Sequence, residues 1–176
     1  MINKLKRKTE KYNLRKVKSG KEILFSGLIY TARDQAHQRL IELISRNKEL
    51  PFDFKNQIIY YCGPTATPEG KIIGSCGPTT SSRMDNFMEP LLTKGLLGVI
   101  GKGRRSKKVR ELIKKYKGVY FLAPAGCGAL LSKKVISRKL VAFGDLGPEA
   151  IYRLEVKDFP LIVAIDSCGN SIYPDL

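Results

Sequence analysis

Short apolar runs alternate with amphipathic segments along most of this chain, and no other feature limits its possible folds so strongly. The apolar runs predict strands at residues 22–30, 58–62, 71–75, 96–100, 119–123, 140–143 and 161–166. Helices are predicted from about residue 34, from about residue 82, after residue 106, near residues 125–129 and over residues 148–154. Strands that alternate with helices are typical of the α/β class, and 176 residues suit one domain.

The charge of the chain is strongly positive and unevenly distributed. The formal net charge is +16, and the first 21 residues carry nine lysines and arginines against one acid, Glu10. We therefore predict a basic N-terminal arm over residues 1–21 and a folded domain over residues 22–176. A second basic surface is expected on the helix between residues 104 and 117. An acidic partner chain or an anionic substrate would balance this charge.

A nucleic-acid-binding module is the alternative from a different class of function. A high positive charge is the electrostatic signature of such modules. No aromatic residues are interleaved with the basic run, however, so the base-stacking pattern of single-strand binders is missing. Nucleic acid is therefore not the partner that we expect.

Neither a membrane segment nor a metal site is indicated. The apolar runs, such as residues 161–165, are too short to cross a bilayer, and no apolar stretch follows the basic N-terminus. A cytoplasmic protein without membrane association is expected. The four cysteines, at positions 62, 76, 127 and 168, form no CxxC pair, and His37 is the single histidine. We expect reduced thiols and no metal ligands in this chain.

An anion site is predicted within residues 74–85, which read GSCGPTTSSRMD. Two isoleucines precede the segment, so it reads as a strand, a tight turn and a helix start. The first turn of a helix carries partial positive charge and unpaired N–H donors. Thr79 and Thr80 add hydroxyl groups there, and Arg83 adds a planar fork that matches a carboxylate. A plain helix cap is the alternative explanation, although capping needs fewer polar groups.

Lys102 lies at a second strand end, flanked by glycines. Residues 101–106 read GKGRRS, which is neither a Walker A loop nor a dinucleotide fingerprint. The glycines allow a ligand to approach the backbone closely. The structural alternative is a basic helix start with Ser106 as its cap, which is electrostatically unfavourable.

Arg33 lies at a third junction between a strand and a helix. Residues 31–37 read TARDQAH, where Thr31 and Asp34 suggest a capping box and Arg33 is placed to face a ligand. His37 is expected to be a hydrogen-bonded structural residue rather than a catalyst. Carboxyl ends of strands in open α/β sheets converge on ligand crevices. The three cations are therefore candidates for a dicarboxylate clamp.

No complete catalytic set is evident. The sequence contains no recognisable Asp/Glu pair, Cys/His pair or Ser/His/Asp set. A threonine hydroxyl has a very high intrinsic pKa, so it cannot act as a base without strong activation. The chain therefore looks like half of an active site.

Several motifs, in order along the chain, resemble the β subunit or C-terminal domain of class I iron–sulfur fumarate hydratases and of the related L(+)-tartrate dehydratases. They are GLIYTARDQAH at residues 27–37, YCGPT at 61–65, GSCGPTTSSRMD at 74–85, GKGRR at 101–105, DLGPEA at 145–150 and DFPLIV at 158–163. The resemblance runs from about residue 20 to the C-terminus, and the basic arm lies outside it.

The resemblance implies a single swivelling β/β/α domain that closes over a partner. In this family a [4Fe–4S] cluster is held by three cysteines of the α subunit or N-terminal domain, so the cysteines here would not be ligands. Carried over by motif, Thr79 is the proton-transfer residue and works with an aspartate of the partner. Substrate-binding roles are implied for Arg33, Thr80, Arg83 and Lys102, with the three cations holding the carboxylates.

The residues and the resemblance together predict the β subunit of a fumarate hydratase, a hydro-lyase of the tricarboxylic acid cycle that interconverts fumarate and (S)-malate. It would be active only with its α subunit, in an α2β2 heterotetramer. The β subunit of L(+)-tartrate dehydratase is the near alternative, because the same clamp would accept a dihydroxy diacid. A regulatory subunit with a degenerate site is a further alternative, and the intact set of five site residues argues against it.

Overall fold

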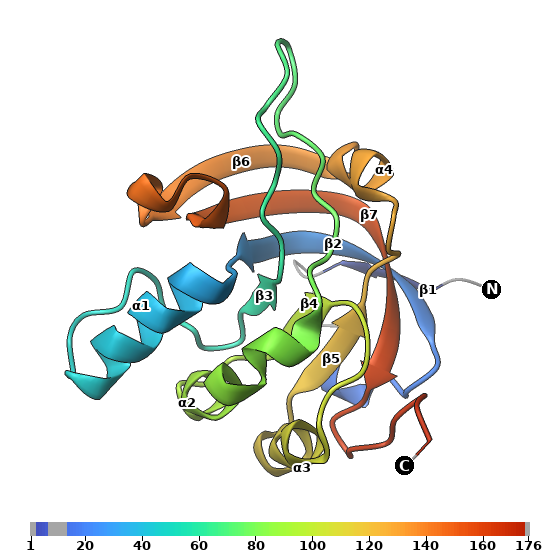
Figure 1. Ribbon diagram of the computed structural model, residues 1–176. Helices are drawn as coiled ribbons and strands as arrows, with labels where there is room; N and C mark the ends of the chain where they lie inside the picture. The colour runs from blue at the N-terminus through green and yellow to red at the C-terminus, as the bar shows by residue number, and fades with distance from the viewer. Residues whose placement is uncertain (1–2, 7–13, 175–176) are drawn as a thin grey trace.

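A mixed sheet that closes on itself forms the framework of the molecule. The computed structural model describes residues 3–6 and 14–174 (Figure 1). Within this part, β2 (Glu22–Thr31), β3 (Ile58–Tyr60), β4 (Gly98–Gly101) and β5 (Val119–Leu122) are neighbours and run parallel. The strand β7 (Ile151–Ile165) pairs antiparallel with both β5 and β2 and thereby closes the ring.

Two further strands extend this ring at its margins. β1 (Asn3–Lys6) pairs parallel with β2, and β6 (Val135–Ala142) pairs antiparallel with β7. β7 can pair with three neighbouring strands because it is 15 residues long. Its first half pairs with β6 and its last residues pair with β5, while β2 runs along the other side. The predicted α/β class and single domain are confirmed, with a barrel-like sheet.

Alternating side chains of the strands fill two separate cores. Inside the ring, Ile58, Tyr60 and Phe121 belong to one buried cluster. On the outer face, Ile59 and Tyr120 belong to a second cluster, which the helices cover. Successive residues of a strand point to opposite faces, so a strand buried on both faces reads as a continuous apolar run. This explains why the short apolar runs predict the central strands correctly.

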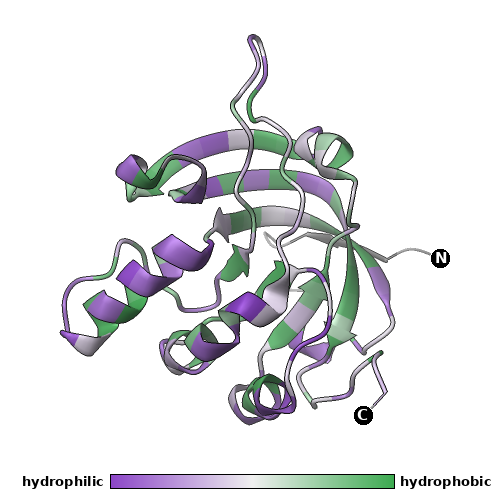
Figure 2. Ribbon diagram, in the orientation of Figure 1, coloured by the Kyte–Doolittle hydropathy of each residue, from purple (hydrophilic) through white to green (hydrophobic). Residues whose placement is uncertain are grey.

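Helices α1 (Asp34–Ser45), α2 (Met88–Thr93) and α3 (Lys107–Tyr116) lie on the outer face of the sheet (Figure 1). Figure 2 shows hydrophobic and hydrophilic residues alternating around α1 and α3, as expected for helices with one face against a core. No helix in the described part of the chain has the length and apolar character needed to cross a membrane.

The helices predicted from about residue 34 and after residue 106 both begin where expected, but only one of their two predicted caps is correct. Ser106 caps α3, because its side chain accepts a hydrogen bond from the Val109 N–H at 3.3 Å. The capping box at Thr31 is wrong. Thr31 is the last residue of β2, and its hydroxyl donates to the Ala150 carbonyl and accepts from the Tyr152 N–H. It therefore ties β2 to the start of β7.

Two predicted elements are wrong. Residues 71–75 form no strand; they belong to a long hairpin loop in which the Thr65 N–H donates to the Ser75 carbonyl at 2.9 Å. The helix predicted at residues 148–154 does not form. Pro148 lies near the end of the short 3₁₀ helix η3 (Gly144–Glu149), and β7 begins at Ile151. Pairing with β2 and β6 satisfies this backbone, and it overrides a weak local preference for helix.

The helix predicted from about residue 82 has a different form. It begins as the 3₁₀ helix η2 (Ser81–Phe87) and continues as α2, so Pro90 lies inside the first turn of α2. The short helix predicted near residues 125–129 is α4 (Gly128–Ser132). A last 3₁₀ turn, η1 (Leu14–Lys16), precedes β2.

Residues 14–21 lie against the domain. Leu14 is buried in the inner core, the Gly20 N–H donates to the Val163 carbonyl at 2.8 Å, and Arg15 Nε donates to the Lys117 carbonyl at 3.1 Å. Residues 1–2 and 7–13 of the predicted basic arm lie outside the described residues. The division between an arm over residues 1–21 and a domain over residues 22–176 stays a prediction.

Replacing Gly98 with alanine is expected to destabilise the domain. A Cβ atom at this position would lie 2.5 Å from the Val119 carbonyl oxygen, within the ladder that joins β4 to β5. The strands would have to shift, and overpacking of this kind costs about 1–3 kcal/mol of unfolding free energy. Chemical denaturation measures the loss. Gly77→Ala is the control, because its Cβ would meet Gly128 at an ordinary 3.5 Å; equal losses in the two variants would contradict the steric explanation.

Candidate functional site

The five predicted site residues lie near the carboxyl ends of neighbouring parallel strands. Arg33 follows β2, and Lys102 follows β4 directly. Thr79 and Thr80 precede η2, and Arg83 lies within it. β3 lies between β2 and β4 in the sheet, so these segments leave the same edge. The structure therefore brings the predicted residues to one rim of the ring.

A short bridge between two loops fixes the threonines beside Lys102. The Thr79 N–H donates to the Tyr61 carbonyl at 2.7 Å, and the Lys102 N–H donates to the Thr79 carbonyl at 3.3 Å. The Ser81 N–H donates to the Lys102 carbonyl at 3.0 Å, and Thr80 pairs with Lys102 in a parallel bridge. Thr79 and Lys102 are half-buried, whereas Thr80 is exposed. The backbone is thus held while polar side chains remain accessible.

Arg33 and Arg83 meet at one carboxylate, that of Asp34. Arg83 Nε donates to Asp34 Oδ1 at 3.0 Å, and Arg83 Nη2 lies 3.0 Å from Oδ2. Arg33 Nη2 lies 3.8 Å from the same Oδ2 and 3.8 Å from Oε1 of Glu149. Arg83 thus holds this carboxylate through one hydrogen bond and an ion pair, and Asp34 Oδ2 itself accepts no hydrogen bond. With 53% of its side chain exposed, Arg83 is accessible for exchange with another carboxylate.

Gly63 leaves the space in which Arg33 lies. A Cβ atom on Gly63 would be 2.8 Å from Arg33 Nη1 and 2.9 Å from Arg33 Cδ, so any larger residue would displace the arginine. Arg33 Nε is buried and has no hydrogen-bond partner in the structure. A buried donor without an acceptor is uncommon, so the hydrogen bonding of Arg33 is incomplete in this structure.

His37 is a buried neighbour of this rim. Its Nδ1 lies 2.8 Å from the Arg33 carbonyl oxygen, and the rings of Tyr61 and Phe87 pack around it at 5.3 and 5.4 Å. Burial lowers the pKa of His37 to about 4, and the positive charge of Arg105 acts in the same direction. The imidazole is therefore neutral at pH 7. This arrangement agrees with the structural role that the sequence favours.

Arg105 and Asp85 form an ion pair beneath the rim, and the sequence analysis assigned a role to neither. Arg105 Nε donates to Asp85 Oδ1 at 2.7 Å, and none of the Arg105 side chain is exposed. The sequence feature that pointed to Arg105 was the basic start of α3, which is electrostatically unfavourable at a helix N-terminus. Nothing in the spacing indicated Asp85, because it lies on a 3₁₀ helix whose form was not predicted.

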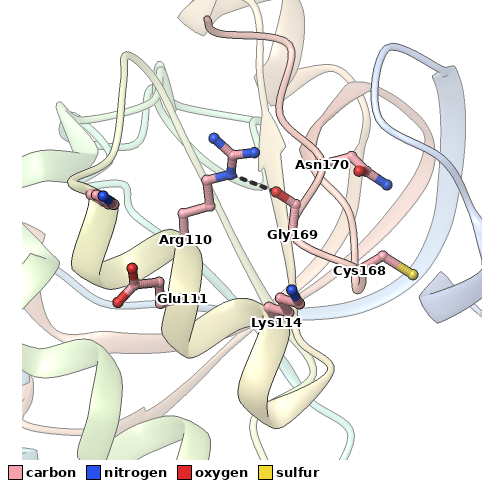
Figure 3. A pocket seen from close by; sticks show the side chains of 7 residues that line it. Arg110, Glu111, Lys114, Cys168, Gly169 and Asn170 are labelled. Carbon is pink, nitrogen blue, oxygen red and sulfur yellow. Dashed lines mark hydrogen bonds between the residues drawn. The ribbon is translucent and has the colours of Figure 1, made fainter. Parts of the chain in front are cut away.

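Two basic hollows lie on a different surface, between α3 and the C-terminal segment. Their volumes are about 280 and 360 Å³, and Lys107 and Arg110 line both. Figure 3 shows the smaller one, in which Arg110 Nε donates to the Gly169 carbonyl at 2.6 Å and Lys114 lies one turn further along α3. None of the five predicted site residues lines either hollow.

The comparison with known families gives one match that covers the chain. The model of the family described as "Fumarase C-terminus" matches residues 2–176. This chain belongs to the fumarase C-terminus family. The match includes residues 2–21, which the motifs quoted above do not cover.

Relatives of this fumarase C-terminus chain include separate subunits and longer proteins. It is 42% identical over 175 residues to a Methanocaldococcus jannaschii protein provisionally named L(+)-tartrate dehydratase subunit beta, covering 96% of this chain and 90% of that protein. Fumarate hydratase 2 of Leishmania major is 36% identical, and the match covers 98% of this chain and 30% of that protein. The anaerobic class I fumarate hydratase of Escherichia coli is 40% identical, and the match covers 86% of this chain and 28% of that protein. The chain thus spans less than a third of these two fumarate hydratases.

Acidification is expected to destabilise the protein through His37. Its pKa is about 4 in the folded protein against an ordinary value of 6.5, so between these values the unfolded chain binds the proton more readily. Stability from this residue is complete above pH 6.5 and is lost as the pH falls toward 4, by about 3 kcal/mol in all. Denaturant unfolding at a series of pH values measures this loss.

His37→Asn is the matched variant for this prediction. The asparagine amide can replace Nδ1 as donor to the Arg33 carbonyl but does not titrate. Because His37 is the single histidine of the chain, the difference between the two proteins isolates its contribution from that of the carboxylates. Parallel pH profiles for variant and wild type would contradict the prediction.

Proposed function

We propose that this chain is the β subunit of a two-subunit hydro-lyase that interconverts fumarate and (S)-malate. The observation that carries the proposal is the meeting of Arg33, Arg83 and Lys102 with a threonine pair at one rim, in a fumarase C-terminus chain. The printed name of one relative as a subunit supports a two-chain enzyme. The chain spans 90% of a relative named as a subunit and 28–30% of two fumarate hydratases.

A dicarboxylate suits this clamp because its two carboxylates need two separate cationic groups. Asp34 already places one carboxylate between Arg33 and Arg83, and a substrate carboxylate would take its place. Lys102 lies on the neighbouring loop and would hold the second carboxylate, with the Thr80 hydroxyl beside it. Addition of water to fumarate passes through an aci-carboxylate with extra negative charge. Fixed cations stabilise this species more than they stabilise the substrate.

Thr79 is the proposed proton-transfer residue. Hydrogen bonds to Tyr61 and Lys102 fix its backbone on both sides, which orients the hydroxyl before substrate binds. The positive charge of Lys102 in the same bridge favours the deprotonated hydroxyl. An aspartate of the α subunit would complete the pair of proton-transfer groups.

The cysteines of this chain do not fit the ligand set of an iron–sulfur cluster. Cys62 and Cys76 are buried and hydrogen-bonded to each other, while Cys127 is half-buried and Cys168 is exposed. In the described residues, no three histidine, cysteine, aspartate or glutamate side chains gather as a metal site. We therefore assign the [4Fe–4S] cluster, which would supply Lewis-acid chemistry, to the α subunit.

The same proposal covers the assembly. The chain would act as a swivelling β/β/α domain that closes over the α subunit, in an α2β2 heterotetramer in the cytoplasm. Separately produced β chain would then be inactive, because the partner would supply the cluster and the second proton-transfer group.

L(+)-tartrate dehydratase β subunit is the second candidate function. The 42% identity to a protein provisionally named as such a subunit favours it, and so does the coverage of 90% of that protein. Tartrate differs from malate by one hydroxyl group, so the same carboxylate clamp serves both diacids. The contact that distinguishes them would lie in the α subunit or in the threonine pair.

Anaerobic reconstitution with the α subunit tests the proposal. The purified complex, with its cluster shown intact by absorbance, is assayed on fumarate, (S)-malate and L(+)-tartrate. We expect turnover of fumarate and malate, and none from the β chain alone. Preference for tartrate would assign the protein to the second function. Turnover of none of the three, or activity of the β chain alone, would overturn the proposal.

Arg83→Ala is expected to lower kcat/KM for the dicarboxylate severely. Loss of one charged contact to the substrate corresponds to about 2–4 kcal/mol of transition-state stabilisation. Steady-state kinetics of the reconstituted complex measure it. Arg46→Ala is the control, because Arg46 forms an exposed ion pair with Glu42 on α1 and should leave the kinetics unchanged. Near-normal kinetics for Arg83→Ala would remove Arg83 from the site.

Thr79→Val is expected to leave folding intact and to lower kcat. Valine keeps the shape of threonine but has no hydroxyl to carry a proton, so the chemical step should slow by about 10²–10⁴-fold. Thr93→Val is the control, since the Thr93 hydroxyl bonds the Glu89 carbonyl within α2 and the Tyr116 hydroxyl of α3, and neither partner is a site residue. An unchanged rate for Thr79→Val would make Thr79 a purely structural residue.

A further inference from the structure

Arg105 is a buried cation directly behind the candidate site. None of its side chain is exposed, and its Nε donates to Asp85 Oδ1 at 2.7 Å. The other oxygen of Asp85 accepts from the Ser106 N–H at 3.0 Å. The carboxylate therefore holds both the arginine side chain and the start of α3. Charges are seldom fully buried unless they are paired in this way.

Two tyrosine rings complete the surroundings of Arg105. Its guanidinium carbon lies 5.5 Å from the Tyr61 ring centroid and 5.2 Å from that of Tyr120, and Nη1 donates to the Tyr61 hydroxyl at 3.4 Å. Cation–π contacts in a desolvated place offset part of the cost of burying the charge. Tyr61 directly follows β3 and Tyr120 lies in β5, so the rings anchor the arginine to two strands.

The same group of side chains joins the two loops of the candidate site. The Tyr120 hydroxyl lies 3.0 Å from Ser81 Oγ and donates to the Gly103 carbonyl at 2.8 Å. Ser81 begins η2, immediately after the threonine pair, and Gly103 follows Lys102. Gly101 has no Cβ, and one would lie 1.9 Å from Ser81 Oγ. The two loops therefore pack in direct contact above a buried polar layer.

Stability alone does not account for this layer. Arg105 Nη2 is buried without a hydrogen-bond partner, so the ion pair is incompletely satisfied. Buried ion pairs can often be replaced by apolar side chains of similar volume with little loss of stability. Apolar residues would not reproduce the directional hydrogen bonds that Arg105 makes. The fork of Arg105 contacts Asp85 of η2 and Tyr61 after β3 at defined angles.

We infer that Arg105 is a positioning residue for the reaction. Together with Asp85 it sets the spacing between the loop that carries Lys102 and the segment that carries Thr79, Thr80 and Arg83, and it does not touch the substrate. This inference rests on the proposed function for its kinetic consequence. The position of the loops is a property of the chain itself, so it can be measured independently of turnover.

Arg105→Met and Arg105→Lys are the informative variants. Methionine matches the volume of arginine without charge, whereas lysine keeps the charge but lacks the fork. The reconstituted complexes are assayed at a temperature well below the melting temperature of each variant. We expect kcat/KM to fall at least 100-fold for Arg105→Met and to fall less for Arg105→Lys. Arg104→Met is the control, because Arg104 is exposed and stacks on Tyr173. It should retain wild-type kinetics.

Hydrogen exchange of the β chain supplies the second readout. The amides of Ser81 and Lys102 bond across the two loops, so their exchange should accelerate at least 10-fold in Arg105→Met. Amides between β4 and β5 should keep their protection, which excludes general unfolding. If Arg105→Met does not fold, Asp85→Asn serves instead, because it keeps the shape of the carboxylate and removes its charge.

Unchanged kcat/KM and unchanged loop exchange in the folded variant would overturn the inference. Faster loop exchange with unchanged kcat/KM would also overturn it, because positioning would then not matter for the reaction. An inactive wild-type complex would overturn the proposed function instead. In that case the exchange measurement alone decides whether Arg105 fixes the loops.

Discussion

The pairing of β7 with two separate parts of the sheet is the constraint on which the rest of the structure depends. β7 is 15 residues long, and it satisfies the edges of β2, β5 and β6 together. Closing the ring encloses the inner core and leaves the outer face for the helices. It also fixes the carboxyl ends of β2, β3 and β4 at one rim, so that loops distant in sequence deliver their side chains to the same place.

Charge is arranged in layers at this rim. Cations reach the surface from Arg33, Arg83 and Lys102, and a fourth cation, Arg105, is buried below them against Asp85. A buried charge is directed by its partner and by the rings around it, whereas an exposed lysine or arginine is free to reach a ligand. The rim thus combines partly exposed cations with a buried ion pair beneath them.

The sequence predicts local features of this fold well and its long-range pairing poorly. Strands β3, β4 and β5 follow from apolar runs, and the start of α3 follows from Ser106, because burial on both faces and capping leave local signatures. The helix predicted at residues 148–154 fails, because β7 is stabilised by strands more than a hundred residues away in sequence. Arg33 and Lys102 follow strands at the predicted places, whereas Thr79, Thr80 and Arg83 reach the rim at the end of a long loop where a strand was predicted. Asp85 and Tyr120 were missed, because their importance lies in contacts that only the folded chain creates.

In the free chain, the carboxylate of Asp34 competes with any other carboxylate for Arg83. A diacid that approaches the rim finds Arg83 already holding a carboxylate, so its apparent affinity is reduced by the fraction of chains in which that pair is closed. An ion pair with a half-exposed arginine contributes about 0–1 kcal/mol, so under the proposed function this competition would lower the affinity of the unassembled chain several-fold. Under the proposed function, contacts from the partner would have to favour the open pair, and substrate capture would become a property of the assembled enzyme. The Asp34–Arg83 pair would then couple substrate binding to assembly with the partner.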